Sequence, residues 1–308
     1  MESMHIISTK QFLDKKILGS IFKLADDMEE KDRAGILINS LKGKILASLF
    51  YEPSTRTRFS FESAMHKLGG NVISTESAIH FSSVTKGESL QDTIKIISGY
   101  SDIIILRHFK EGSAEIASRF SSVPIINAGD GMGEHPTQAL LDLYTIKKEF
   151  GNIDNIKIAL LGDLLYGRTI HSLLHLLGAY NVDIFLISPE QLKLPEKYKN
   201  YLDKKGIDYK EIDNIKKIIK EIDVLYVTRI QKERFNSEDE YEKLKNSYKI
   251  DSEMLKEMKD NAIIMHPLPR VNEISTDIDD DKRAAYFRQA KNGLYIRMAL
   301  LEMIFKKN

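Results

Sequence analysis

The chain of 308 residues is 42% hydrophobic and 29% charged, a composition typical of a globular protein and not of a disordered one. Its 45 basic residues balance 45 acidic ones, so no overall field favours nucleic acid or an anionic membrane as a partner. It has no cysteine, which excludes disulfides, thiolate catalysis and cysteine-ligated zinc. We expect a cytoplasmic protein, because the first residues lack the pattern of a secretory signal and no apolar run approaches the roughly 20 residues that span a bilayer.

Short apolar, β-branched runs alternate along the chain with helical patterns. We predict strands, in chain order, at Lys44–Phe50, Asn71–Thr75, Asp102–Leu106, Val123–Asn127, Ile156–Gly162, Val182–Ser188, Val224–Thr228 and Ala262–Met265. This alternation predicts an α/β fold of parallel sheets that are flanked by helices on both faces. The length favours two domains, each with a sheet of about four strands, over one sheet of eight.

Helical patterns lie between these runs. The apolar residues of 61–68 recur at the spacing of one helical face, and a second pattern runs from Pro136 to Gly151 near the middle of the chain. We place the domain boundary at the start of this second helix. Residues 1–135, together with a C-terminal helix over 290–308, then form the first domain, and residues 136–289 form the second.

Unusual polar groups follow the carboxyl ends of the predicted strands. They lie at 54–57, 107–108, 135–138, 163–168, 229–231 and 266–270. Open α/β sheets bind ligands in the crevice outside the carboxyl ends of their strands, whereas a fold without a ligand would scatter arginine and histidine over exposed helix faces. We therefore predict one active site in a cleft between the two domains.

The segment FYEPSTRTRFSFE at 50–62 has the strongest chemical signal. A serine in the N-cap position precedes a helical pattern whose first turn contains Arg56 and Arg58. Two cations there oppose the positive end of the helix dipole, and a bound phosphate would reverse this cost. Hydroxyls, free N–H groups and a guanidinium suit a tetrahedral dianion. The alternative is a capped helix in which Arg56 or Arg58 pairs with Glu52 or Glu62.

This segment resembles the carbamoyl-phosphate motif of the aspartate and ornithine carbamoyltransferases. Further segments resemble motifs of that family in the family's order: LRH at 106–108, HPTQ at 135–138, GDLLYGRT at 162–169, TRIQKER at 228–234 and HPLPR at 266–270. The resemblance implies a carbamoyl-phosphate-binding first domain and an aspartate-binding second domain. It assigns the phosphate to four consecutive residues, Ser54, Thr55, Arg56 and Thr57.

The same resemblance implies how the carbamoyl group is held. Three side chains point at its carbonyl oxygen, as in an oxyanion hole: Thr57, Arg107 and His135. Its NH2 group is held by Gln138 and by the carbonyl groups of Pro267 and Leu268. His135 would act as a neutral donor; the alternative is that this histidine, directly before a proline, simply caps the helix. Phosphate would accept the proton of the amine, because these motifs contain no glutamate or lysine that is an obvious base.

The second half of the chain contains the residues expected to bind the acceptor. Arg168, Arg229 and Gln231 match the family's aspartate binders, and two carboxylates need two cationic groups. Ornithine carbamoyltransferases typically have HCLP where this chain has HPLPR. The resemblance thus implies formation of N-carbamoyl-L-aspartate, an early step of pyrimidine biosynthesis. Transfer to ornithine and a non-catalytic assembly subunit are the alternatives; a dehydrogenase would need a glycine-rich first turn that is missing.

The polar loop at 81–87 has no periodicity, and a lone lysine in such a loop is usually a solvated charge. The resemblance instead assigns Ser82 and Lys86 to the active site of a neighbouring subunit, which implies a homotrimer with shared sites; Ser83 is an alternative to Ser82. Regulatory chains, cooperativity and a dihydroorotase partner are left open. No cofactor is implied, and we expect no metal, because His171 and His175 lack the remaining ligands of a zinc site.

Overall fold

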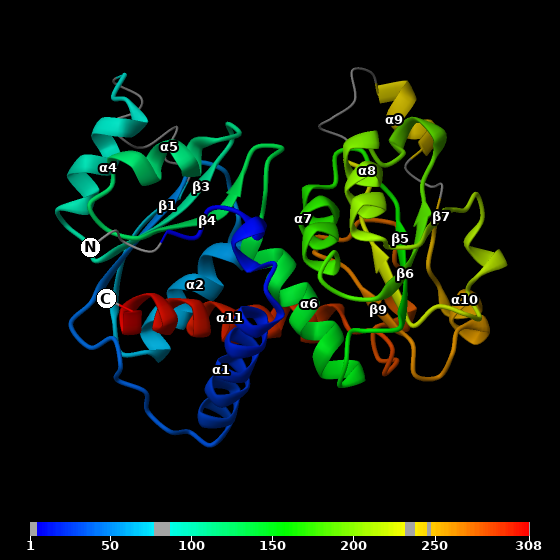
Figure 1. Ribbon diagram of the computed structural model, residues 1–308, viewed down its shortest axis with the longest axis horizontal. Helices are drawn as coiled ribbons and strands as arrows, with labels where there is room; N and C mark the ends of the chain where they lie inside the picture. Colours follow the sequence, from blue (N-terminus) through cyan, green and yellow to red (C-terminus); the bar gives the residue numbers. More distant parts are fainter. Residues whose placement is uncertain (1–4, 77–86, 232–237, 245–247, 308) are drawn as a thin grey trace. The chain divides into compact units, whose positions relative to one another are not determined.

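The computed structural model describes residues 5–76, 87–231, 238–244 and 248–307 (Figure 1). The chain divides into two compact units, the first made of Met1–Leu141 and Lys291–Asn308 and the second of Asp142–Ala290. The divisions fall within two helices: α6 (Pro136–Phe150), whose first residue follows the predicted domain boundary, and α11 (Tyr286–Lys307). Each unit contains one sheet, and every strand pairing in both sheets is parallel. The predicted fold class is therefore confirmed.

The first unit contains a four-stranded sheet in the order β2-β1-β3-β4. Its strands are β1 (Ile45–Phe50), β2 (Asn71–Glu76), β3 (Ile103–His108) and β4 (Ile125–Asp130). The inner strands β1 and β3 are buried almost throughout, which explains their mostly apolar sequences, and β4 is buried throughout although it contains Asn127 and Asp130. The edge strand β2 is largely exposed, and its sequence is accordingly more polar.

Helices cover both faces of this sheet (Figure 1). They are η1 (Thr9–Phe12), α1 (Lys15–Arg33), α2 (Thr55–Lys67), α4 (Leu90–Ser98), α5 (Ser113–Phe120), the start of α6 and most of α11 (Tyr286–Lys307). The predicted apolar face at 61–68 is confirmed, because Phe61, Ala64 and Met65 of α2 are fully buried. The helix α11 returns to this unit, where the guanidinium of Arg297 lies 4.9 Å from the ring centre of Phe61.

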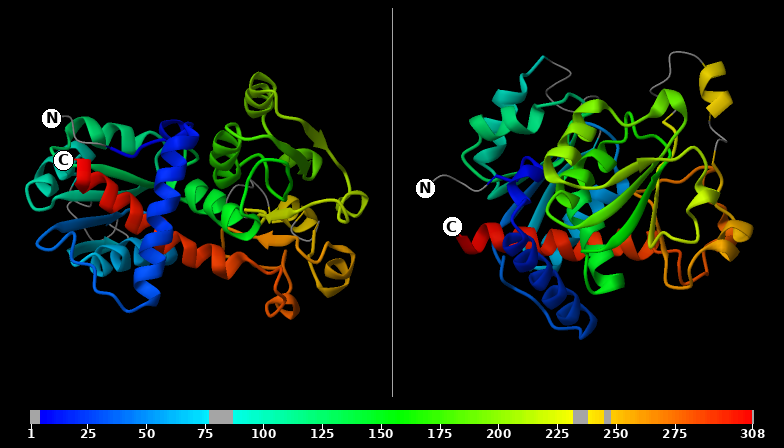
Figure 2. Two further views of the ribbon diagram at one scale, coloured as in Figure 1. Left: turned by 60° about the horizontal axis from the view of Figure 1, so that its bottom comes forward. Right: turned by 45° about the vertical axis from the view of Figure 1, so that its right-hand side comes forward.

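The second unit contains a five-stranded sheet in the order β7-β6-β5-β8-β9, which Figure 2 shows from two further sides. Its strands are β5 (Ile156–Leu161), β6 (Val182–Ile187), β7 (Tyr209–Glu211), β8 (Val224–Val227) and β9 (Ile263–Met265). The eight predicted strands all occur, with ends shifted by a few residues. The edge strand β7 was not predicted, because its three residues are partly or fully exposed and form no apolar run.

The second unit also contains α7 (Arg168–Leu177), α8 (Glu196–Lys205), α9 (Glu238–Leu244), α10 (Ser252–Glu257) and the short turns η3 (Glu190–Leu192), η4 (Ile215–Lys217) and η6 (Thr276–Ile278). From the mixed charges of residues 237–249, the sequence predicts a solvated loop. This prediction is wrong, since α9 forms within that segment. Glutamate and lysine are good helix formers, which accounts for the difference. Among the described helices, none is long and apolar enough to cross a membrane.

Candidate active site

The start of α2 presents unused backbone donors. Ser54 occupies the N-cap position in the loop after β1, as predicted, and Thr55 begins the helix. The Ser54 hydroxyl accepts no capping hydrogen bond from the described first turn of α2. The N–H of Arg58 donates to the Ser54 carbonyl at 3.1 Å, whereas the earlier N–H groups, those of residues 55–57, have no acceptor within the helix and can bind an anion. Thr57 is buried at the same turn, with 8% of its surface exposed.

The two arginines of this turn have different surroundings. Arg58 lies 2.9 Å from the carboxylate of Glu76 and 3.7 Å from that of Glu62, and its guanidinium stacks over the ring of Phe59. Arg56 forms no ion pair within the described part of the chain. Partial desolvation lowers the pKa of its guanidinium, and a bound anion would oppose that shift. The contacts favour a structural role for Arg58 and leave Arg56 available to a ligand.

Arg107 lies beside this segment at the end of β3. It pairs in register with Phe50 of β1, and its carbonyl accepts the N–H of Tyr51 at 2.9 Å. The Arg107 side chain donates from Nη1 to the carbonyl of Ala128 at 3.3 Å, and its Nε lies 3.3 Å from the Glu52 carboxylate. Glu52 thus pairs with Arg107 rather than with either arginine of α2.

His135 and Gln138 lie at the start of α6 and are nearly buried, with 4% and 9% of their surfaces exposed. The loop before them is held by the carboxylate of Asp130, which accepts the N–H groups of Gly112 at 2.9 Å and of Glu134 at 3.3 Å. Burial raises the pKa of Asp130, and these hydrogen bonds oppose that rise. One carboxylate therefore ties together the loops that follow β3 and β4.

The residue before His135 fastens this loop to the beginning of the chain. Glu134 accepts the hydroxyl of Ser8 at 2.7 Å and the N–H of Thr9 at 2.6 Å. Next to it, the side-chain amide of Asn127 donates to the carbonyl of Ile7 at 3.0 Å. Neither Glu134 nor Asp130 could be identified from the sequence, because each has a partner that only the fold brings near, Ser8 for Glu134 and Gly112 for Asp130.

In the second unit, a glycine lets the segments that follow β5 and β8 approach each other closely. Gly162 has a φ of +120°, and a Cβ atom there would lie 2.2 Å from the carbonyl oxygen of Thr228. The hydroxyl of Thr228 accepts the N–H of Asp163 at 3.1 Å. This contact joins the two segments that contain the predicted aspartate binders, at 162–169 and 228–231.

Asp163 connects the same two segments through its side chain. It is fully buried, and its carboxylate accepts the N–H of Tyr166 at 2.9 Å and the side-chain amide of Gln231 at 3.2 Å. Burial raises the pKa of Asp163, and these donors oppose the rise. Arg168 begins α7 at the end of this turn, while Arg229 follows β8 two residues before Gln231. Asp163 therefore holds the predicted aspartate binder Gln231 directly, and it also holds the turn that precedes Arg168.

His171 stabilises the same turn from α7. Its Nε2 atom lies 2.8 Å from the carbonyl oxygen of Leu164, and its ring stacks on Tyr198 at a centroid distance of 4.0 Å. Burial lowers the pKa of His171 to about 4, so the ring is neutral at pH 7 and Nε2 donates to the carbonyl. The described residues contain no group of three or more potential metal ligands.

Pro267 and Leu268 lie in the loop after β9. Leu268 has a positive φ of 56°, and the Leu268–Pro269 peptide bond is cis. The loop continues to Arg270, which forms an ion pair with Asp279 and donates to the hydroxyl of Tyr286 at 3.1 Å. These contacts give Arg270 a structural role at the end of the HPLPR segment.

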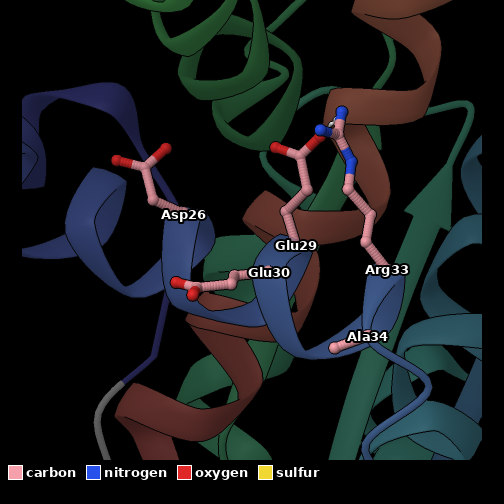
Figure 3. Close-up of a pocket in the computed structure, with 5 residues that line it drawn as sticks. All are labelled: Asp26, Glu29, Glu30, Arg33 and Ala34. Carbon is pink, nitrogen blue, oxygen red and sulfur yellow. Dashed lines mark ion pairs between the residues drawn. The ribbon is translucent and has the colours of Figure 1, made fainter.

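Two predicted site residues, Ser82 and Lys86, lie outside the described residues. A surface pocket of about 400 Å³ lies elsewhere, on α1, and none of the predicted site residues lines it (Figure 3). Its lining is mainly acidic and includes an ion pair between Glu29 and Arg33.

The chain matches a known family over most of its length. Residues 4–148 match the carbamoyl-P binding domain of the aspartate/ornithine carbamoyltransferases, and residues 154–304 match their Asp/Orn binding domain. The aspartate carbamoyltransferase catalytic subunit of Leptospira biflexa is 54% identical over 297 residues, which cover 96% of this chain and 95% of that protein. The same subunit of Clostridium novyi is 52% identical over 288 residues, 93% of each chain.

Solved structures agree with these matches. The catalytic subunit of M. jannaschii aspartate transcarbamoylase superposes with a TM-score of 0.92 at 52% identity, covering 100% of this chain and 99% of that one. Aspartate transcarbamoylase from Trypanosoma cruzi, in complex with N-(phosphonacetyl)-L-aspartic acid, superposes with a TM-score of 0.89 at 41% identity, covering 98% of this chain and 95% of that one. The order of its motifs, its two parallel sheets and these matches together show that the chain belongs to the aspartate/ornithine carbamoyltransferase family.

Proposed function

We propose that this chain transfers the carbamoyl group of carbamoyl phosphate to the amine of L-aspartate, with N-carbamoyl-L-aspartate and phosphate as products. Relatives that are 51–54% identical over nearly the whole chain are named aspartate carbamoyltransferase, which favours aspartate over ornithine as the acceptor. The structural observation that supports the donor most directly is the start of α2, where uncapped N–H groups, hydroxyls and Arg56 occur together.

The donor's phosphate binds Ser54, Thr55, Arg56 and Thr57 in this proposal. Three donors then polarise the carbamoyl carbonyl: Thr57, Arg107 and His135. Such donors stabilise the negative charge that develops on the oxygen as the amine attacks, and one of them typically contributes about 10²–10³ in rate. The carbamoyl NH2 group donates to Gln138 and to the carbonyls of Pro267 and Leu268, which orients the reacting carbon.

Aspartate binds through its two carboxylates to Arg168, Arg229 and Gln231. Its neutral amine attacks the carbamoyl carbon, a C–N bond forms, and the bond from that carbon to the phosphate oxygen breaks. The departing phosphate takes the proton that the amine loses. Asp163 supports this half of the site because it holds Gln231 and the turn before Arg168.

Ser82 and Lys86 of a neighbouring subunit complete the site in a homotrimer under this proposal, and Lys86 contacts both substrates. Mixing inactive Lys86→Ala protein with inactive Arg56→Ala protein should restore part of the activity, because some mixed trimers contain one intact site. Absence of recovery after proven subunit exchange would refute the shared site.

The phosphate assignment is tested by comparing Arg56→Ala with Arg58→Ala as a matched control. Both variants remove one guanidinium from the same helical turn. Arg56→Ala should weaken binding of carbamoyl phosphate at least tenfold, since charge-assisted hydrogen bonds contribute about 1.5–3 kcal/mol. Arg58→Ala should mainly lower stability. Equal binding of carbamoyl phosphate by wild type and Arg56→Ala would contradict the assignment.

A further inference from the structure

The backbone of Leu268 is in an unfavourable conformation. Its φ of 56° is in the left-handed region, which residues with a Cβ atom rarely adopt. Such conformations persist only where surrounding contacts enforce them, and they occur often at ligand-binding sites. The contacts that enforce this one therefore bear on the function of the loop.

The side chain of His266 provides the enforcing contact. Its Nδ1 atom lies 2.7 Å from the backbone nitrogen of Leu268, and its Nε2 atom lies 2.8 Å from the carboxylate of Glu273. The Leu268 N–H can only donate, so Nδ1 must accept and be unprotonated. The ring is then neutral and donates its proton from Nε2 to Glu273. Only 2% of the His266 surface and 7% of the Glu273 surface is exposed, which keeps water from competing for these hydrogen bonds.

Glu273 is itself held in place. Its carboxylate accepts the N–H groups of Val271 at 3.2 Å and of Asn272 at 3.1 Å. Burial acts to raise the pKa of Glu273, but the hydrogen bonds from His266 and from the backbone lower it overall. The carboxylate is therefore ionised at pH 7 and forms a charge-assisted hydrogen bond with the imidazole.

A second set of buried contacts fixes the backbone of His266. Its N–H donates to the side-chain oxygen of Gln289 at 2.8 Å, and the Gln289 amide donates to Asp142 at 2.6 Å. Asp142 also accepts the hydroxyl of Tyr226 at 2.8 Å. The histidine is thus anchored on both its backbone and its ring, and the conformation of Leu268 follows from that anchoring.

We propose that His266 and Glu273 are positioning residues that determine donor specificity by holding the carbonyls of Pro267 and Leu268 where a carbamoyl NH2 group can donate to them. This inference rests on the proposed function and deepens it. Two carbonyl oxygens accept hydrogen bonds from an NH2 group and receive none from a methyl group. The site should therefore discriminate between carbamoyl phosphate and acetyl phosphate, which differ only in that group.

Titration calorimetry of the full chain with each of these two compounds, without aspartate, tests the proposal. Wild-type protein should bind carbamoyl phosphate more tightly than acetyl phosphate. In His266→Ala and in Glu273→Ala this preference should fall about tenfold or more, as expected for two lost hydrogen bonds. His266→Asn should retain more of the preference than His266→Ala, because its side-chain oxygen can accept the Leu268 N–H in place of Nδ1.

Leu202→Ala is the stability control. Leu202 is fully buried in α8 of the same unit, so the variant is destabilised without any change at the loop. It should keep the wild-type preference. Wild-type preference in a folded His266→Ala or Glu273→Ala protein would overturn the proposal, as would an equal loss in Leu202→Ala.

One measurement on the unmodified chain keeps the test independent of how well the variants fold. The ¹⁵N spectrum of histidine-labelled wild-type protein, assigned by comparison with His266→Asn, should show His266 neutral and protonated at Nε2 at pH 7. Protonation at Nδ1 would overturn the proposal. If wild-type protein has this ring state and binds neither compound, the proposed function fails while the positioning contact stands.

Discussion

Replacement of the buried carboxylate of Asp163 tests how the acceptor half of the site is held together. Asp163→Ala leaves the Tyr166 N–H and the Gln231 amide, which now donate at 2.9 and 3.2 Å, without their acceptor. A fully buried donor that loses its partner costs about 1–3 kcal/mol, or about 2–6 kcal/mol for a pair. Both of these hydrogen bonds are only partly buried, which places the cost at the lower end. Burial raises the pKa of Asp163, which means that the fold bears a desolvation cost for the charged form. Removing the carboxylate also removes that desolvation cost. We therefore expect the free energy of unfolding to fall by about 2–3 kcal/mol, at the lower end of the range of about 2–6 kcal/mol.

Urea unfolding measures this loss of stability, and steady-state kinetics measures its functional consequence. Since Gln231 is released, the KM for aspartate should rise more than the KM for carbamoyl phosphate. Asp163→Asn is the matched control: its side-chain oxygen can still accept the Tyr166 N–H, and its NH2 can donate to Gln231 once that amide turns over. Its stability should be close to that of the wild type. A stability of Asp163→Ala within about 0.5 kcal/mol of the wild type, the usual range for surface changes, would refute the reasoning.

Three further variants follow from the geometry. Arg107→Ala should lower turnover by about 10²–10³ without unfolding the protein, and near-normal turnover would contradict its assigned role. Gly162→Ala places a Cβ atom 2.2 Å from the Thr228 carbonyl and should lower the melting temperature far more than Gly206→Ala, a positive-φ position with open space around it; equal losses would contradict the close contact. His171 has a pKa of about 4 in the folded protein, below the value of 6.5 expected in the unfolded chain, so its contribution to stability is lost as the pH falls from 6.5 towards 4. In urea unfolding at a series of pH values, the free energy of unfolding of His171→Gln should therefore fall less over this range than that of the wild type.

The alternation of strands and helices could be predicted from the sequence, because buried parallel strands require long apolar runs. The exceptions are informative. The edge strand β7 is too short and too exposed to give such a run, and α9 lies in a charged segment that is rich in the good helix formers glutamate and lysine. Elements with few buried residues leave little hydrophobic pattern in the sequence.

The position of the candidate site at strand ends could be predicted, but the contacts that support it could not. The sequence leaves open whether Arg56 or Arg58 pairs with a neighbouring glutamate, and the structure assigns the ion pairs to Arg58, with Glu62 on α2 and with Glu76 on β2. Buried polar groups such as Glu273 depend on partners that tertiary structure brings near. A carboxylate in a polar segment looks solvated until the fold buries it.

The most direct test of the central claim is a product analysis with purified protein, carbamoyl phosphate and either L-aspartate or L-ornithine. The proposed function predicts N-carbamoyl-L-aspartate and an equal amount of phosphate in the first reaction and no carbamoylated product in the second. Formation of citrulline from ornithine, or absence of any carbamoylated product from a folded protein with aspartate, would contradict it.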